Sequence, residues 1–140
     1  MMEPIVVRPG VAVRSDALSF RAVRASGPGG QNVNKVSSKV ELRVDLALID
    51  GLDAGARARL AHLCATSLDA DGRLIVTSQV TRDQRRNLED ARDKVRILVE
   101  RALVRPRARR KTRPTRGSVE RRLSDKKRRS QTKAVRGDRD

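Results

Sequence analysis

A ten-residue segment, residues 26–35, has the composition of a loop that could carry chemistry. It reads Ser-Gly-Pro-Gly-Gly-Gln-Asn-Val-Asn-Lys, and its three glycines, proline and two asparagines exclude a regular helix or strand. Glycines tolerate positive φ and let the backbone approach a ligand closely. Such a loop can direct peptide N–H groups at an oxyanion or a departing alkoxide, where one donor lowers the barrier by roughly 3–4 kcal/mol.

A flexible hairpin connection is the simpler interpretation of a glycine-rich loop. Two features argue against it here: the segment holds more glycines than a hairpin requires, and cations lie close to it in the sequence. These cations are Arg21, Arg24, Lys35 and Lys39. A nucleotide-binding P-loop is excluded, because the Gly-Lys-Ser/Thr ending of that motif is missing.

The segment needs rigid flanking elements, and the sequence predicts a strand on each side of it. Before it, Leu18, Phe20 and Ala22 alternate with Ser19, Arg21 and Val23. After it, apolar positions alternate strictly with charged ones, which predicts one buried and one solvated face. The apolar positions of this second strand are Val40, Leu42, Val44 and Leu46.

The remaining body favours a small α+β domain over residues 1–104. Residues 1–16 are expected to form an irregular or short extended lead-in, interrupted by Pro4, Pro9 and Gly10. We expect a helix over 54–67 capped by Asp53, a short strand at 74–77, and a helix from a Thr81 capping box to about residue 104. The apolar stripe of that helix is Leu88, Ala91, Val95, Leu98 and Ala102. A short mixed or antiparallel sheet would then pack against two helices.

The formal net charge is +16, and most of it lies in the C-terminal segment. Residues 105–140 contain 16 Lys and Arg against 4 Asp and Glu, and so carry +12, whereas residues 1–104 carry +4. Such a charge indicates a polyanionic partner, and nucleic acid is favoured over a membrane because no basic helix is backed by a strong apolar face. With little apolar area, this tail is expected to be disordered until bound, with a weak helical signal at 118–129.

Other kinds of chemistry have little support in the composition. Cys64 is the one cysteine and His62 the one histidine, so a disulfide or a zinc cluster is excluded, and no metal or cofactor is expected. We expect Cys64 to be a small buried residue and His62 a surface residue rather than a general base. No apolar run is long enough for a membrane span or a signal peptide, so a cytoplasmic monomer is expected.

The glycine-rich segment, followed by Val-Ser-Ser-Lys-Val-Glu-Leu-Arg at 36–43, closely resembles the catalytic domain of class I peptide-chain release factors. Gly-Gly-Gln followed by Val-Asn-Lys is the hallmark of that family. Three stretches of the tail, residues 113–116, 120–126 and 133–137, resemble the tail of the short codon-independent rescue hydrolases within it. The body between residues 47 and 104 matches in length and pattern only.

The resemblance implies hydrolysis of the peptidyl-tRNA ester in the peptidyl transferase centre of the ribosome. It implies that the backbone N–H of Gln31 stabilises the transition state while its side chain positions or excludes water. Gly29 and Gly30 would provide the conformation that places Gln31 there. Lys35 is expected to shape the loop or to contact RNA phosphate.

The resemblance also implies that the tail enters the empty mRNA entrance channel of the small subunit and binds ribosomal RNA. The expected anchors are Arg122, Leu123, Lys126, Lys133 and Arg136. With 140 residues there is no room for a domain that reads stop codons, so codon-independent rescue of stalled ribosomes is expected. Two alternatives stay open: a non-enzymatic ribosome-binding or RNA-binding accessory protein, and a hydrolase acting on split large subunits.

Overall fold

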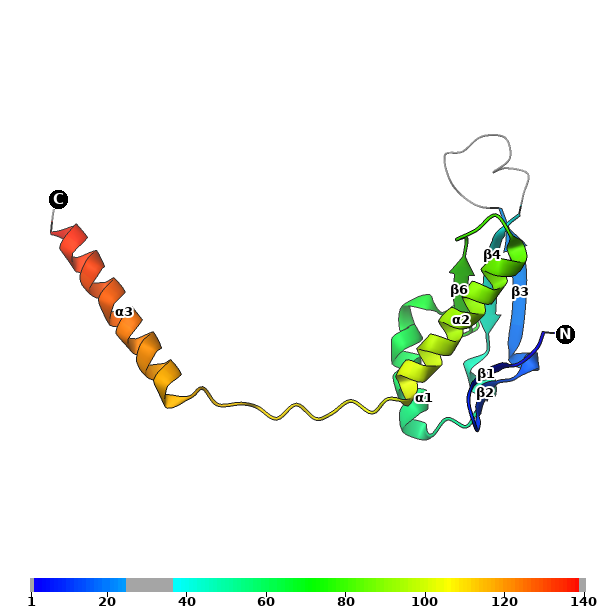
Figure 1. Cartoon of the computed structure of the whole chain (residues 1–140), viewed down its shortest axis with the longest axis horizontal. Coiled ribbons are helices and arrows are strands. Elements are labelled where there is room, and N and C mark those ends of the chain that lie inside the picture. Colours follow the sequence, from blue (N-terminus) through cyan, green and yellow to red (C-terminus); the bar gives the residue numbers. More distant parts are fainter. Residues whose placement is uncertain (1, 25–36, 139–140) are drawn as a thin grey trace. The chain divides into compact units, whose positions relative to one another are not determined.

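The structure, a computed structural model, describes residues 2–24 and 37–138 (Figure 1). The chain divides into two units, Met1–Pro106 and Arg107–Asp140. The first unit contains two three-stranded antiparallel sheets and two helices, α1 (Ala54–Cys64) and α2 (Gln84–Leu103). The second contains one helix, α3 (Arg116–Gly137). The α+β class predicted from the sequence is confirmed.

The larger sheet carries the two strands predicted to flank the glycine-rich segment. Its order is β3 (Leu18–Val23), β4 (Lys39–Val44) and β6 (Leu74–Ser78), with β4 in the centre. Val40, Leu42 and Val44 are completely buried, as their alternation predicts. Phe20 on β3 stays 40% exposed, because α2 packs mainly on β4 and β6 and leaves the edge strand partly uncovered.

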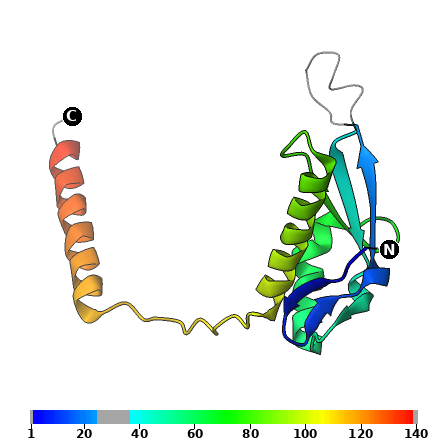
Figure 2. The same ribbon diagram turned by 45° about the vertical axis from the view of Figure 1, so that its right-hand side comes forward.

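A second sheet takes two of its strands from residues 1–16, where the sequence predicted an irregular or short extended lead-in; the extended alternative is confirmed, but its pairing into a sheet was not predicted. Its strands are β1 (Ile5–Arg8), β2 (Val11–Val13) and β5 (Ile49–Asp50). Two of the supposed breakers, Pro9 and Gly10, form the turn between β1 and β2, in which Gly10 adopts φ +83°. Gly51 has the same φ, and a Cβ there would overlap the carbonyl oxygen of Gly10. This sheet lies at the opposite end of the unit from the end of β3 and the start of β4 (Figures 1 and 2).

Helix α1 packs against α2 and begins at the predicted cap. Asp53 Oδ1 accepts a hydrogen bond from the Ala56 N–H at 2.6 Å. That bond lowers the pKa of the Asp53 carboxyl below its ordinary value. The helix ends at Cys64 rather than continuing as far as residue 67, because residues Ala65–Ser67 form a 3₁₀ turn. Arg59 Nε ties α1 to the end of α2 by donating to the Ala102 carbonyl at 2.7 Å.

Helix α2 starts at a different cap from the one predicted. Asp83, not Thr81, accepts from the first-turn N–H groups, those of Arg85 at 2.8 Å and Arg86 at 3.4 Å. Asp83 directly precedes the helix, and its short side chain places the carboxylate within reach of the first-turn N–H groups, so it takes the capping role. The buried positions are Asn87, Ala91, Val95, Val99 and Ala102, whereas Leu88 and Leu98 are only partly buried. The inward-facing stripe therefore begins with a polar residue that the apolar pattern did not identify.

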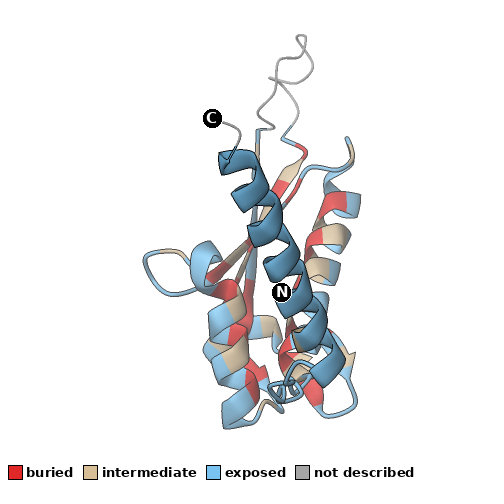
Figure 3. Cartoon of the chain, turned by 90° about the vertical axis from the view of Figure 1, so that its left-hand side faces the viewer, coloured by how far each residue is buried: buried red, intermediate tan, exposed pale blue. Residues whose placement is uncertain are grey.

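The tail is not disordered: α3 is a 22-residue helix, which corrects the expectation from composition. Thr115 caps it by accepting from the Ser118 N–H at 3.3 Å. Most of its residues have high helix propensity, and its length exceeds the roughly 12–15 residues below which isolated helices are marginal. No residue of α3 is buried (Figure 3). Local propensity and capping therefore define this helix without an apolar core.

Candidate functional site

The strands that flank the glycine-rich segment form a continuous antiparallel pair. Their register runs from Leu18 opposite Val44 to Val23 opposite Lys39. The end of β3 and the start of β4 therefore lie side by side at one end of the sheet (Figure 2). Gly29, Gly30, Gln31 and Lys35 belong to this connection and lie outside the described residues. The structure does describe the two flanking segments, residues 18–24 and 37–44, which we call the stem. The fully buried side chains of β4 anchor the stem in the core.

The returning end of the stem is bound to α2 by Asn87, which is completely buried. Asn87 Nδ2 donates to the Ser38 carbonyl at 2.7 Å and to the Thr81 carbonyl at 2.8 Å. Asn87 Oδ1 accepts from the Thr81 N–H at 2.8 Å and from Thr81 Oγ1 at 3.0 Å. We call these four bonds the Asn87 network. They join the residue just before β4, the turn before α2, and α2 itself.

A second polar link between the sheet and α2 lies beside the Asn87 network. Ser78 Oγ, 2% exposed as a residue, donates to Asp90 Oδ2 at 2.7 Å. Lys94 Nζ lies 2.7 Å from the same oxygen and also donates to the Thr77 carbonyl. The Lys94 ammonium first, and then the Ser78 hydroxyl, lower the pKa of the Asp90 carboxyl. This link holds β6 against α2 without touching Ser38.

The solvated face of the stem carries a cross-strand ion-pair cluster. Glu41 Oε1 on β4 lies 3.0 Å from Arg21 Nε on β3 and 3.0 Å from Arg43. The Arg21 hydrogen bond, with help from Arg43, lowers the pKa of the Glu41 carboxyl. Exposed pairs of this kind contribute only up to about 1 kcal/mol, but they favour one register of the two strands. Among the described residues, Arg24 and Lys39 at the end of the stem have no acidic partner within ion-pair distance.

Three exposed arginines surround the start of α2 at the same end of the unit. They are Arg82, Arg85 and Arg86. The first turn of α2 holds no acidic residue, although acids are favoured there and cations disfavoured by the helix dipole. The nearest carboxylates are loosely placed, with Asp83 at 4.0 Å from Arg86 and Glu89 at 3.8 Å from Arg85. Asp83 caps this helix end, but the three exposed arginines around it leave a positive surface of a kind that suits phosphates.

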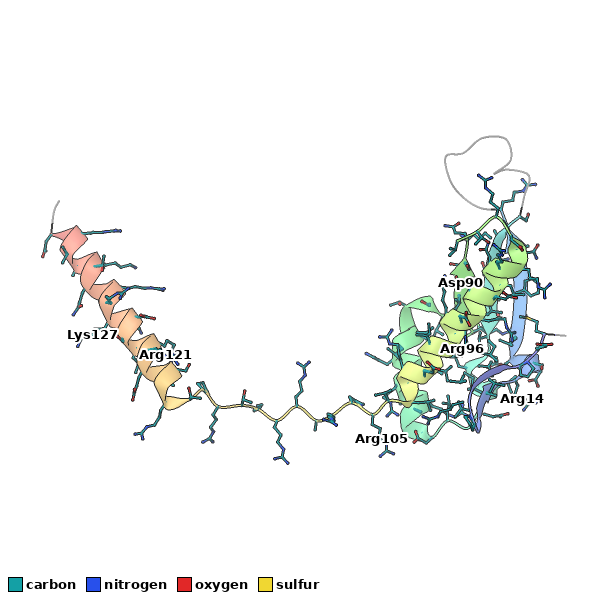
Figure 4. All side chains as sticks on the ribbon, viewed as in Figure 1. Arg14, Asp90, Arg96, Arg105, Arg121 and Lys127 are labelled. Carbon is teal, nitrogen blue, oxygen red and sulfur yellow. The ribbon has the colours of Figure 1, made fainter. Side chains whose placement is uncertain are left out.

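In the second unit, α3 concentrates cations on one side. Steps of four and three residues place five cations on one face, although side chains project on all sides of the helix (Figure 4). This cationic face of α3 comprises Arg122, Lys126, Arg129, Lys133 and Arg136. The first four line one continuous surface, in which Asp125 is the one acid. Leu123 projects from a neighbouring face and is 55% exposed.

Comparison of the sequence with known protein families gives a match over nearly the whole chain. Residues 7–138, from β1 to the end of α3, match the RF-1 domain. The chain belongs to the RF-1 domain family. It is 44% identical over 115 residues to peptidyl-tRNA hydrolase ArfB of Pseudomonas putida, covering 82% of this chain and 83% of that protein. The resemblance to release factors predicted from the glycine-rich segment is thereby confirmed.

Two further relatives match over shorter stretches. The chain is 42% identical over 84 residues to large ribosomal subunit protein mL62 of Mus musculus, covering 60% of this chain and 41% of that protein. It is 59% identical over 32 residues to a probable mitochondrial peptide chain release factor 1 of Caenorhabditis elegans, covering 23% of this chain and 8% of that protein. The second match concerns only a small part of either protein.

Outside the stem, the described part of this RF-1 domain offers little acid–base or nucleophilic chemistry. His62 is exposed on α1, as expected. Cys64 is 1% exposed, and burial raises the pKa of its thiol, so the reactive thiolate is disfavoured. Among residues 2–24 and 37–138, no three His, Cys, Asp or Glu side chains are grouped so as to hold a metal ion. Nor does any helix in those ranges have the length and apolarity to cross a membrane.

The structure brings together four of the five predicted tail anchors and adds a residue that the sequence analysis missed. Arg122, Lys126, Lys133 and Arg136 share the cationic face of α3, and Arg129 lies between them. Their spacing of four, three, four and three residues is the sequence signal for a shared face. It predicts that face only once the segment is assigned as a helix. Asn87 was also missed, because an apolar-pattern analysis passes over a polar residue.

Proposed function

We propose that this chain is a peptidyl-tRNA hydrolase that releases nascent peptides from stalled ribosomes without reading a codon. The observation that carries the proposal is the 44% identity to ArfB over most of both chains. The position of Gly-Gly-Gln between β3 and β4, at the end of a rigid stem, supports it.

In the proposed reaction, water attacks the carbonyl carbon of the ester that joins the peptide to the tRNA. The bond from that carbon to the ribose oxygen breaks, the leaving oxygen takes a proton, and the attacking water loses one. The Gln31 N–H donates to the oxygen on which charge develops, and the Gln31 side chain orients or excludes water. Gly29 and Gly30 allow the backbone conformation this requires.

The proposed reaction does not depend on a titrating side chain of this chain. One well-placed amide donor changes kcat by roughly 10²–10³. The absence of a role for a titrating side chain is consistent with the described residues, where Cys64 is buried and His62 lies on the surface of α1. Lys35 and the exposed arginines near the stem would contact ribosomal RNA around the ester.

For the second unit, we propose that α3 occupies the empty mRNA entrance channel of the small subunit. The cationic face of α3 binds ribosomal RNA phosphates, with Arg122, Lys126, Lys133 and Arg136 as anchors and Leu123 as an apolar contact. The segment before α3 adds charge without any acid. Its cations are Arg105, Arg107, Arg109, Arg110, Lys111 and Arg113. If hydrolysis requires α3 to occupy the channel, it would be restricted to ribosomes whose channel holds no mRNA.

The test compares peptide release from two ribosome complexes that differ only in mRNA length. In one, the mRNA ends at the peptidyl-tRNA codon; in the other, it extends through the entrance channel. We expect rapid release from the first and a large loss with the second. Equal release from both would contradict the proposed role of α3, whereas no release from either, with normal binding, would favour a non-enzymatic accessory protein.

A second candidate function is hydrolysis on split large subunits, and the similarity to mL62, a large-subunit protein, favours it. Isolated large subunits that carry peptidyl-tRNA distinguish the two. If a chain lacking residues 107–140 releases peptide from them as fast as the full chain, the large subunit suffices. If release requires both whole ribosomes and the full chain, the first proposal holds.

A further inference from the structure

Asn87 is a polar residue at a position where the fold otherwise buries apolar side chains. It shares the inward stripe of α2 with Ala91, Val95 and Val99, and it is completely buried. Asparagine is a weaker helix former than the leucine or alanine that such a stripe normally contains, and a buried amide is costly unless it is hydrogen-bonded. An apolar residue of similar size would leave the Ser38 and Thr81 backbone groups without these partners.

The amide of Asn87 uses its full bonding capacity. Asparagine offers two N–H donors and two acceptor lone pairs, and each has a partner at 2.7–3.0 Å, although the single Thr81 hydroxyl hydrogen is shared with the Asp83 carbonyl at 3.1 Å. Three of the four bonds go to Thr81, which fixes the turn before α2. The fourth goes to the Ser38 carbonyl, across 49 positions of the sequence. Asn87 thus links the start of α2 to the stem.

Ser38 lies at the point where sheet pairing no longer constrains the chain. The β3–β4 ladder ends with Val23 opposite Lys39, and the β4–β6 ladder ends with Val40 opposite Ser78. Ser38, which is 9% exposed, is one residue beyond the first ladder. The bond from Asn87 Nδ2 therefore sets the orientation of the peptide group that joins Ser38 to Lys39, at the end of the ladder nearest Gln31 in the sequence.

We propose that Asn87 is a positioning residue, which fixes the returning end of the Gly-Gly-Gln connection by holding the Ser38 carbonyl against α2. This inference rests on the proposed hydrolase function. An amide donor must be held within about 0.5 Å of its productive position, and a misplacement of about 1 Å costs on the order of 10²-fold in rate. Loss of the Ser38 bond should therefore lower the rate of the chemical step more than ribosome binding.

The most informative variant is Asn87→Asp. It is isosteric and keeps the acceptor for the Thr81 N–H and hydroxyl, but it places a carboxylate oxygen against the Ser38 and Thr81 carbonyl oxygens. Asn87→Ala removes the whole network and serves as the second variant. Two controls lower stability without touching Ser38, and melting temperatures compare them with the Asn87 variants. Ser78→Ala removes the neighbouring polar link to Asp90, and Val99→Ala opens a small cavity near the other end of α2.

Three quantities are measured for each variant, at a temperature where all are folded. They are the single-turnover rate of peptide release at saturating protein, the concentration for half-maximal ribosome binding, and hydrogen exchange of the amides at residues 37–40. For Asn87→Asp we expect a 10- to 100-fold slower release, binding within about 3-fold of the parent chain, and faster exchange. Ser78→Ala and Val99→Ala should release peptide at nearly the parental rate.

The proposal is overturned if Asn87→Asp releases peptide as fast as a control of equal melting temperature. It is also overturned if exchange at residues 37–40 is unchanged, because the stem would then be held by other contacts. If the parent chain itself releases no peptide, the proposed hydrolase function fails. The exchange comparison between Asn87→Asp and Ser78→Ala still decides whether Asn87 holds the stem.

Discussion

At the residue scale, three carboxylates are each held in their charged form by a different kind of partner. Arg21 stabilises Glu41, the Ala56 N–H at the start of α1 stabilises Asp53, and Lys94 with Ser78 stabilises Asp90. Each partner lowers the carboxyl pKa in the folded state. The unfolded chain therefore binds more protons than the folded chain at acidic pH, and stability rises with pH through this range.

We expect the free energy of unfolding to be constant near neutral pH and to fall as the pH drops below about 4, where these groups would ordinarily titrate. Asp90→Asn should flatten part of this fall, because its ion pair with Lys94 is lost at all pH values. Denaturant unfolding at a series of pH values measures the effect. Asp50→Asn, at an exposed carboxylate, is the control. A fall of the same steepness in Asp90→Asn and the parent chain would contradict this assignment.

At the element scale, α3 displays cations on one face, and the position of a cation should matter as much as its charge. Arg129→Ala removes a cation from the cationic face of α3, and Arg128→Ala removes one from another side. We expect Arg129→Ala to weaken ribosome binding more and to reduce the slope of log affinity against log salt by about 1. Salt-dependent binding titrations make the comparison, and equal effects would indicate a nonspecific polyelectrolyte.

The helical form of α3 can be tested without changing its charge. Ser124 lies on the side of the helix away from the cationic face. Ser124→Pro breaks the helix, at a cost of roughly 3 kcal/mol, and divides the cationic face in two, whereas Ser124→Ala preserves it. We expect lower far-ultraviolet helicity and weaker ribosome binding for Ser124→Pro only. Unchanged binding by Ser124→Pro would mean that charge alone is recognised.

At the scale of the whole molecule, the two units differ in what stabilises them. The buried core extends from Ile5 to Ala102, entirely within the first unit, and α3 contributes nothing to it. A chain ending at Pro106 should therefore unfold at a melting temperature within a few degrees of that of the full chain. Differential scanning calorimetry of both chains measures this. A large loss of stability on truncation would show that the tail supports the core.

The sequence predicted the elements whose pattern is local and strongly periodic. Val40, Leu42 and Val44 alternate as a half-buried strand does, and Asp53 precedes its helix as a cap does. The sequence failed where the outcome depended on distant contacts. The hairpin at Pro9 and Gly10 could not be predicted locally, because its short strand β2 also pairs with β5, which is remote in the sequence.

The candidate site was predicted in part. The chemistry of Gly29, Gly30 and Gln31 was proposed from composition and resemblance, and it stays a prediction because these residues lie outside the described part. Asn87 could not be found, because its role depends on Ser38, 49 positions away. The helix at 116–137 was predicted only as a weak signal at 118–129 in a disordered tail, because a low apolar content was given more weight than helix propensity and the Thr115 cap.

The central claim is that a main-chain amide at residue 31 promotes ester hydrolysis. Its most direct test is the single-turnover rate of peptide release, on ribosomes lacking downstream mRNA, for Gln31→Ala and Gln31→Pro. Alanine removes the side chain and keeps the N–H, whereas proline also removes the N–H. We expect Gln31→Pro to be at least about 100-fold slower than Gln31→Ala with equal ribosome binding. Equal release rates for the two variants would contradict the claim.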